Sequence, residues 1–112
     1  MKTNLSLDIH QTFPGYQPMP LIGITSDSSY AKAVQKEGGV PLVLPPYDNA
    51  DMLVNLLNTI DGILFTHEPA PLLTQLTSNR QIPTLSVGQE NPSIQELVYE
   101  ASLFKAAKSL HN

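Results

Sequence analysis

Four short apolar runs recur along the chain after residue 20, and each is followed by a segment with helical spacing. The runs are rich in β-branched residues and almost continuous, without strict alternation of polar and apolar positions. Such runs are typical of strands that are buried on both faces of a sheet. We therefore expect strands at residues 21–25, 40–46, 62–66 and 83–87.

The segments between these runs place their apolar residues on one helical face. The clearest case has leucine or isoleucine at i, i+3, i+4 and i+7, at Leu53, Leu56, Leu57 and Ile60. Gly38-Gly39 and Asp61-Gly62 provide stops for two helices. We expect a helix up to about Glu37, one capped by Asp48, one whose first turn holds Pro69 and Pro71, and one from about Pro92-Ser93 with Ile94, Leu97, Val98, Ala101 and Phe104 along one side.

Strands and helices alternate strictly in this pattern, which predicts an α/β fold. The short connections favour right-handed crossovers and therefore a parallel sheet with helices on both faces. The expected fold is a three-layer, flavodoxin-like sandwich with a short, mainly parallel sheet of about four strands. Residues 1–19 lack the periodicity and are expected to form an extended N-terminal arm, while residues 20–112 form a single domain.

Charge and cysteine content exclude several classes of function. The chain carries a formal net charge of −4, and its 6 basic residues are scattered, so no basic stripe is available for a nucleic-acid backbone. With 0 cysteines among 112 residues, the chain has no disulfide, no thiolate metal site and no cysteine nucleophile. Patterns that cradle nucleotide phosphates are absent, and we expect neither a cofactor nor a metal.

Membrane insertion and export are not expected from the sequence. No apolar run approaches the roughly 20 residues needed to span a bilayer. The first 20 residues have no apolar core or small-residue cleavage site typical of a signal peptide. The sequence therefore predicts a cytoplasmic protein.

Two segments carry a recognisable family pattern: PLIGITSDSSYAKAVQKEGGVPLVLPP and LNTIDGILFT. They resemble the start of the gamma-glutamyl-gamma-aminobutyrate hydrolases, which are class I glutamine amidotransferase-like proteins with the pattern P-x-I-G-I-T, Y-x-x-A-V-x-x-A-G-G-x-P-x-x-L-P and L-D-G-L-L-L-T-G-G. The resemblance covers roughly residues 20–90. The matching positions are Pro20, Ile22 to Thr25, Tyr30, Ala33, Val34, Gly38, Gly39, Pro41, Leu44, Pro45, Asp61, Gly62 and Thr66.

The departures from the family pattern affect its catalytic positions. The resemblance implies a glycine pair after the third strand that helps to form an oxyanion hole, but His67 and Glu68 stand there. It also implies P-x-L-G-I-C-R-G after the fourth strand, where Gly88 falls on the nucleophilic cysteine and Gln89 on the arginine. The family's histidine and glutamate lie further along than Asn112. We therefore expect a truncated, degenerate member without catalytic residues, which acts as a binding or interaction module.

Other interpretations stay open. One alternative is that the chain has glutamine amidotransferase or gamma-glutamyl hydrolase activity. Its active site would then use non-standard residues or be completed by a partner chain. Ser86 is the substitute nucleophile to consider, although a packed strand serine explains it equally well. A small-molecule-binding domain of the periplasmic-binding or regulator type is a second alternative, and a gene interrupted by a premature stop is another.

Polar residues gather where the predicted strands end. In an open α/β sheet this edge is where ligands bind, although exposure alone also explains polar loops. A small-molecule ligand would contact Asp27, Thr66, His67, Glu68, Gln89 and Glu90. A sheet that stops after four strands also leaves an uncovered edge and helix face, so we expect a homodimer or other self-association through that edge.

Overall fold

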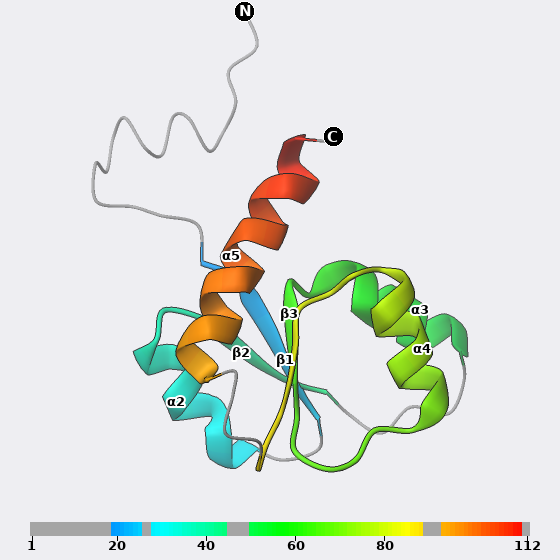
Figure 1. Ribbon diagram of the computed structural model, residues 1–112, viewed down its shortest axis with the longest axis horizontal. Coiled ribbons are helices and arrows are strands. Elements are labelled where there is room, and N and C mark those ends of the chain that lie inside the picture. The colour runs from blue at the N-terminus through cyan, green and yellow to red at the C-terminus, as the bar shows by residue number, and fades with distance from the viewer. Residues whose placement is uncertain (1–18, 26–27, 45–49, 89–92, 111–112) are drawn as a thin grey trace, which may run out of the picture.

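In the described part of the chain, the fold consists of four strands and five helical segments, and each strand is followed by one or two of the helical segments (Figure 1). The computed structural model describes residues 19–25, 28–44, 50–88 and 93–110. The elements are β1 (Leu21–Thr25), the 3-10 helix η1 (Ser28–Tyr30), α2 (Ala31–Lys36), β2 (Val40–Leu44), α3 (Ala50–Thr59), β3 (Gly62–Phe65), α4 (Pro71–Asn79), β4 (Thr84–Ser86) and α5 (Ile94–Leu110).

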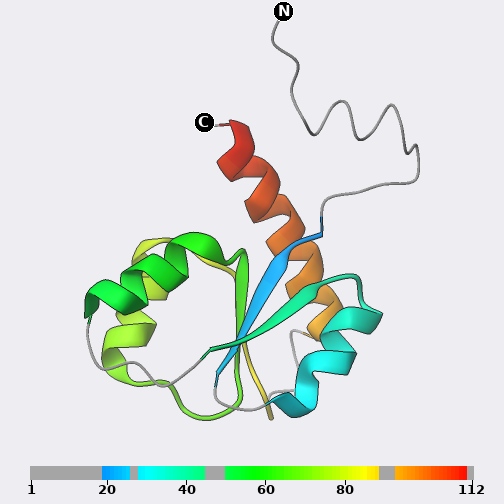
Figure 2. The same cartoon turned by 180° about the vertical axis from the view of Figure 1, so that it is seen from behind.

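The four strands form one parallel sheet in the order β2-β1-β3-β4. Helices α2 and α5 cover one face of this sheet, and α3 and α4 cover the other (Figures 1 and 2). This arrangement confirms the predicted three-layer, flavodoxin-like α/β sandwich. The observed strand β3 is one residue shorter than expected and β4 is one residue shorter at each end, while the predicted end of β2, residues 45–46, lies outside the described residues.

Each face of the sheet has its own hydrophobic core. Successive residues of a buried strand point to opposite faces, so the almost continuous apolar runs supply both cores at once. The core under α2 and α5 contains Ile22, Ile24, Val34, Leu64, Leu85, Leu97, Val98 and Ala101. The core under α3 and α4 contains Leu44, Leu53, Leu57, Ile60, Ile63, Phe65, Leu73 and Ile82.

Helices α4 and α5 begin close to where the sequence predicts. Pro71 is the first residue of α4, where its missing N–H costs nothing. Ser93 and Glu96 form a reciprocal capping box at the start of α5, with Glu96 N 3.2 Å from Ser93 Oγ and Ser93 N 3.4 Å from Glu96 Oε1. The predicted cap Asp48 and nearly all of the predicted N-terminal arm, residues 1–18, lie outside the described residues.

Helix α5 approaches the sheet closely because Gly62 has no side chain. A Cβ atom at this position would lie 3.0 Å from the Cβ of Ala101 on α5. The small side chains at these two positions therefore let α5 approach strand β3 closely, and a larger residue at either position would push them apart.

Asp61 fastens the amino ends of the two central strands to α5. Its carboxylate accepts a hydrogen bond from the Leu21 N–H at 2.8 Å, and its own N–H donates to the Leu21 carbonyl at 2.7 Å. Lys108 Nζ lies 2.7 Å from Asp61 Oδ1 and also donates to the Ile60 carbonyl at 3.1 Å. Lys105 Nζ lies 3.8 Å from Asp61 Oδ2. We call Asp61 and the residues that it contacts (Leu21, Lys105 and Lys108) the Asp61 clip. The sequence predicted only that Asp61 follows the end of a helix.

Candidate functional site

Two threonines tie the carboxyl ends of β1 and β3 together. The Thr66 N–H donates to Thr25 Oγ1 at 2.9 Å, and the Thr66 hydroxyl donates to the Thr25 carbonyl. The two hydroxyl oxygens are 3.3 Å apart. These bonds fix the point at which the chain leaves β3, and so they position the residues that follow.

The segment after Thr66 carries His67 and Glu68, the two residues that replace the glycines expected from the resemblance. Both side chains are exposed, whereas Thr66 and Pro69 are half-buried. The segment then enters α4 at Pro71. An imidazole and a carboxylate are thus presented next to each other at the carboxyl edge of the sheet, where ligands of open α/β folds bind.

A hollow of about 600 Å³ lies at this edge, between the residues that follow β3 and those that end β4. It brings together four residues that the sequence singled out: Thr66, His67, Glu68 and Gly88. We call it the edge hollow; its lining is completed by Pro69, Ser86 and Val87. Three further expected ligand-binding residues, Asp27, Gln89 and Glu90, lie outside the described residues.

Gly88 occupies the sharp turn after β4. Its φ is +98°, a backbone conformation that glycine adopts without a steric penalty. Just before Gly88, the Val87 N–H donates a hydrogen bond to the Phe65 carbonyl at 2.9 Å, which is the last bond between the ends of β4 and β3. Among the described residues beyond its chain neighbours, no heavy atom would lie within 4 Å of a Cβ at Gly88, so on their side the turn is open where a nucleophilic side chain would project.

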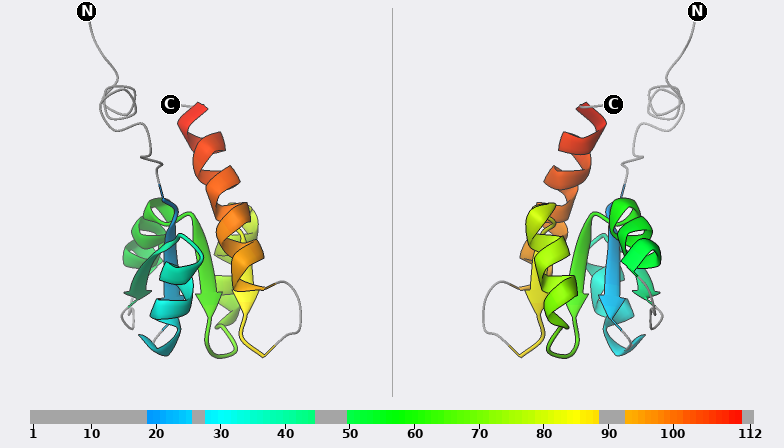
Figure 3. Two further views of the ribbon diagram at one scale, coloured as in Figure 1. Left: turned by 90° about the vertical axis from the view of Figure 1, so that its left-hand side faces the viewer. Right: turned by 90° about the vertical axis from the view of Figure 1, so that its right-hand side faces the viewer.

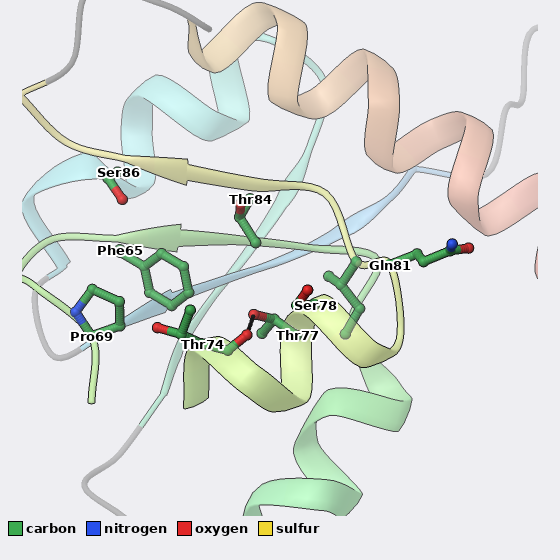
Figure 4. Close-up of a pocket in the computed structure, with 9 residues that line it drawn as sticks. Phe65, Pro69, Thr74, Thr77, Ser78, Gln81, Thr84 and Ser86 are labelled. Atoms are coloured by element: carbon green, nitrogen blue, oxygen red, sulfur yellow. Dashed lines mark hydrogen bonds between the residues drawn. The ribbon is translucent and has the colours of Figure 1, made fainter. Parts of the chain in front are cut away.

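A second hollow, of about 410 Å³, lies between β4 and α4 (Figure 4). Hydroxyl groups surround an apolar floor that includes Phe65, as the labelled side chains in Figure 4 show. The hydroxyl-bearing residues are Thr74, Thr77, Ser78, Thr84 and Ser86. Ser86 and Pro69 line both hollows, which are therefore neighbours along the open edge of the sheet. The sequence did not predict this second hollow, because its residues come from a strand and a helix that are unremarkable by themselves.

The chemistry available at the edge hollow is that of a polar ligand site. It offers one carboxylate, one imidazole and two hydroxyls beside apolar Pro69 and Val87. Within the described part of the chain, no group of three or more histidine, aspartate or glutamate side chains is arranged to hold a metal ion. No described helix is long and apolar enough to cross a membrane.

Fold and family comparison together define the class of the protein. The parallel sandwich has the outline of a class I glutamine amidotransferase-like domain, and the family described as Peptidase C26 matches residues 20–89, which contain all four strands. The chain belongs to the Peptidase C26 family. A comparison with curated proteins finds no match.

Proposed function

We propose that this chain is a catalytically inactive class I glutamine amidotransferase-like domain that works as a binding or interaction module. The observation that carries the proposal is Gly88 at the turn after β4. Acyl transfer in this class needs a nucleophilic side chain at a strand-to-helix turn. Glycine supplies none, and the chain contains 0 cysteines that could act from elsewhere.

The residues after β3 support the same proposal. An oxyanion hole needs backbone N–H groups that approach the substrate carbonyl closely, which adjacent glycines permit. His67 and Glu68 place two side chains on this segment instead, and both residues line the edge hollow. The Glu68 carboxylate would oppose the negative charge that develops on a substrate oxygen.

The same two residues favour binding of a small polar ligand. A hollow of about 600 Å³ has the size of a small-molecule site. We propose that a ligand with an ammonium group binds there, with the ammonium facing Glu68 and an acceptor group facing His67. Glutamine and gamma-glutamyl amines are the first probes, because they carry both kinds of group.

Isothermal titration calorimetry with these probes tests the binding proposal. Wild type should bind, and Glu68→Gln should weaken binding of the ammonium-bearing probes because it removes the negative charge while keeping the size of the side chain. Glu100→Gln, an exposed glutamate on α5, is the matched control and should bind as wild type does. If Glu68→Gln binds every probe as tightly as wild type, the carboxylate is not part of a ligand site.

Hydrolase activity through non-standard residues is the second candidate. Ser86 and His67 line the same hollow, which provides a hydroxyl and a base at one place. Against this function, Ser86 is the last residue of β4 and its side chain lies on the α4 side of the sheet with Thr84 (Figure 4), whereas the position of a nucleophile in this class is the turn at Gly88. If the activity exists, Ser86→Ala abolishes it.

Three further expectations remain proposals. Self-association through the open edge of the sheet is supported by β4 having a neighbour on one side only, at β3, among the described strands. A binding domain of the periplasmic-binding type is less well supported than the amidotransferase-like class, because the family match favours the latter. Cytoplasmic localisation also stays a prediction.

A further inference from the structure

The second hollow, between β4 and α4, has a volume of about 410 Å³ and is surrounded by hydroxyl groups, so we call it the hydroxyl hollow. Figure 4 shows hydroxyl-bearing side chains of β4 on one side of it and those of α4 on the other, with Phe65 between them. Thr84 and Ser86 line it together because residues two apart on a strand point to the same face. An apolar floor with polar groups around it is typical of a small-molecule site.

The hydroxyl groups of this hollow are available to a ligand. Those of Ser78, Thr84 and Ser86 form no hydrogen bond with another described residue. The two threonine hydroxyls of α4 donate to backbone carbonyls of the same helix and its N-cap, at 3.0 and 3.4 Å, so they can only accept from a ligand. The group that suits the hollow therefore both donates and accepts hydrogen bonds, as a hydroxyl does.

The hydroxyl hollow also differs from the edge hollow in its charge. None of the described residues that line the hydroxyl hollow carries a charge, whereas the edge hollow contains the Glu68 carboxylate. A charged group in the hydroxyl hollow would lose water without meeting an opposite charge. The net charge of −4 on the chain further opposes an anion. The hydroxyl hollow therefore favours an uncharged group.

Ser86 connects the two hollows. It lines both of them, together with Pro69. Ser86 is half-buried at the end of β4 and is paired in register with Phe65, the floor of the hydroxyl hollow. A ligand that fills both hollows would pass the Ser86 hydroxyl, which can donate to or accept from an amide group of the ligand.

We propose that one ligand occupies both hollows, with an amino-acid head in the edge hollow and an uncharged, hydroxyl-bearing tail in the hydroxyl hollow. The inference rests on the proposed function, which concerns the head alone, and adds the chemistry of the tail. The ligand class is a gamma-glutamyl amide whose nitrogen carries a short neutral chain. Its ammonium group faces Glu68, its amide lies beside Ser86, and its terminal hydroxyl contacts Thr84 and Ser78.

Isothermal titration calorimetry with three probes that share one head tests the tail. Glutamine has no tail, gamma-glutamyl-aminobutanol ends in a hydroxyl, and gamma-glutamyl-gamma-aminobutyrate ends in a carboxylate at the same place. Wild type should bind the alcohol roughly tenfold more tightly than glutamine, because the tail adds hydrogen bonds and buried apolar surface. The acid should bind less tightly than the alcohol. Equal affinities for glutamine and the alcohol, or a preference for the acid, overturn the inference while the head site stands.

A matched pair of threonine variants tests which hollow holds the tail. Thr84→Val removes a hydroxyl of the hollow and keeps the shape of the side chain, so it should weaken the alcohol about fivefold and leave glutamine unchanged. Thr59→Val, at an exposed threonine of α3, should bind both probes as wild type does. Circular dichroism verifies that both variants are folded. Thr84→Val that keeps the full preference for the alcohol would overturn the inference.

A matched pair of serine variants tests the neutrality of the hollow. Ser78→Lys places a cation at the hydroxyl hollow and should reverse the order of the alcohol and the acid. Ser109→Lys makes the same change in the last turn of α5, outside both hollows, and should keep the wild-type order. An equal shift in the two variants would show that net charge decides the order, which overturns the inference.

Glu68→Gln separates this inference from the proposed function. It should weaken all three probes by a similar factor, because they share the ammonium group. If it leaves the alcohol unchanged while Thr84→Val weakens it, the head site is wrong and a ligand shared by the two hollows is overturned. Binding of none of the probes to wild type contradicts the head site and the tail site together.

Discussion

The Asp61 clip predicts a large loss of stability when its carboxylate is removed. Asp61 is 2% exposed and bonds to the Leu21 N–H at 2.8 Å, with Lys108 2.7 Å from its other oxygen. In Asp61→Ala the Leu21 N–H loses its charged acceptor, which costs about 1.5–3 kcal/mol. Because Lys108 is 36% exposed, its ion pair adds only about 0.2–1 kcal/mol. We expect a total loss of about 3 kcal/mol.

Urea denaturation followed by circular dichroism measures this loss. With a slope of about 1.5 kcal/mol per molar urea, Asp61→Ala should unfold about 2 M earlier than wild type. Asp61→Asn keeps an acceptor for Leu21 and should lose only about half as much. Lys32→Met on α2 removes an exposed lysine outside the clip and is expected to leave the midpoint unchanged.

A double-mutant cycle shows whether the clip acts as one unit. Asp61→Asn and Lys108→Met should be less than additive, with a coupling of about 0.5–1 kcal/mol. The reasoning is refuted if Asp61→Ala costs less than about 1 kcal/mol, since that would show that the half-buried Leu21 N–H finds water in place of its acceptor at little cost.

Three further changes test other parts of the fold by the same urea measurement. Gly62→Ala should destabilise by about 1–3 kcal/mol, because its Cβ would meet the Ala101 Cβ at 3.0 Å, and a cost near zero would show that α5 shifts freely. Thr66→Val should cost about 1–2 kcal/mol, since it leaves the Thr25 carbonyl without its hydroxyl donor; an unchanged midpoint would contradict that bond. Ser93→Ala removes the α5 cap and should cost about 1 kcal/mol, while Ser93→Asp should retain most of the stability.

Most of the fold could be predicted from hydrophobic patterning. The apolar runs match β1 to β4, and in the stripe ahead of β3 the structure buries Leu53, Leu57 and Ile60. Such positions are predictable because burial imposes the period of the element on the sequence. The ends of strands are less predictable, because pairing with neighbours decides them. Strand β4 contains only Thr84–Ser86 although the apolar run extends to Val87.

The edge hollow was predictable in part. In a parallel sheet the carboxyl ends of all strands meet at one edge, so residues after β3 and after β4 could be expected together. The structure does bring Thr66, His67, Glu68 and Gly88 together there. The structure also shows that Thr25 holds Thr66 in place through hydrogen bonds. The two residues are 41 positions apart, and no local sequence pattern reveals such a contact.

Long-range polar contacts account for what the sequence did not predict. The Asp61 clip joins residues of β1, of α5 and of the turn just before β3, and each looks ordinary within its own segment. Helix α5 also carries apolar residues on the side away from the sheet, but the inner stripe alone was enough to predict the helix. Only the structure shows that Tyr99, Leu103 and Leu110 stay exposed when the sandwich is complete.

A gamma-glutamyl hydrolysis assay tests the central claim most directly. Purified wild type is incubated with glutamine and with gamma-glutamyl-gamma-aminobutyrate, and released glutamate is measured beside Ser86→Ala and His67→Ala. Because Gly88 provides no nucleophile, all three proteins should release glutamate at the rate of buffer alone. Turnover by wild type that either substitution abolishes would contradict the proposal and identify this domain as an enzyme.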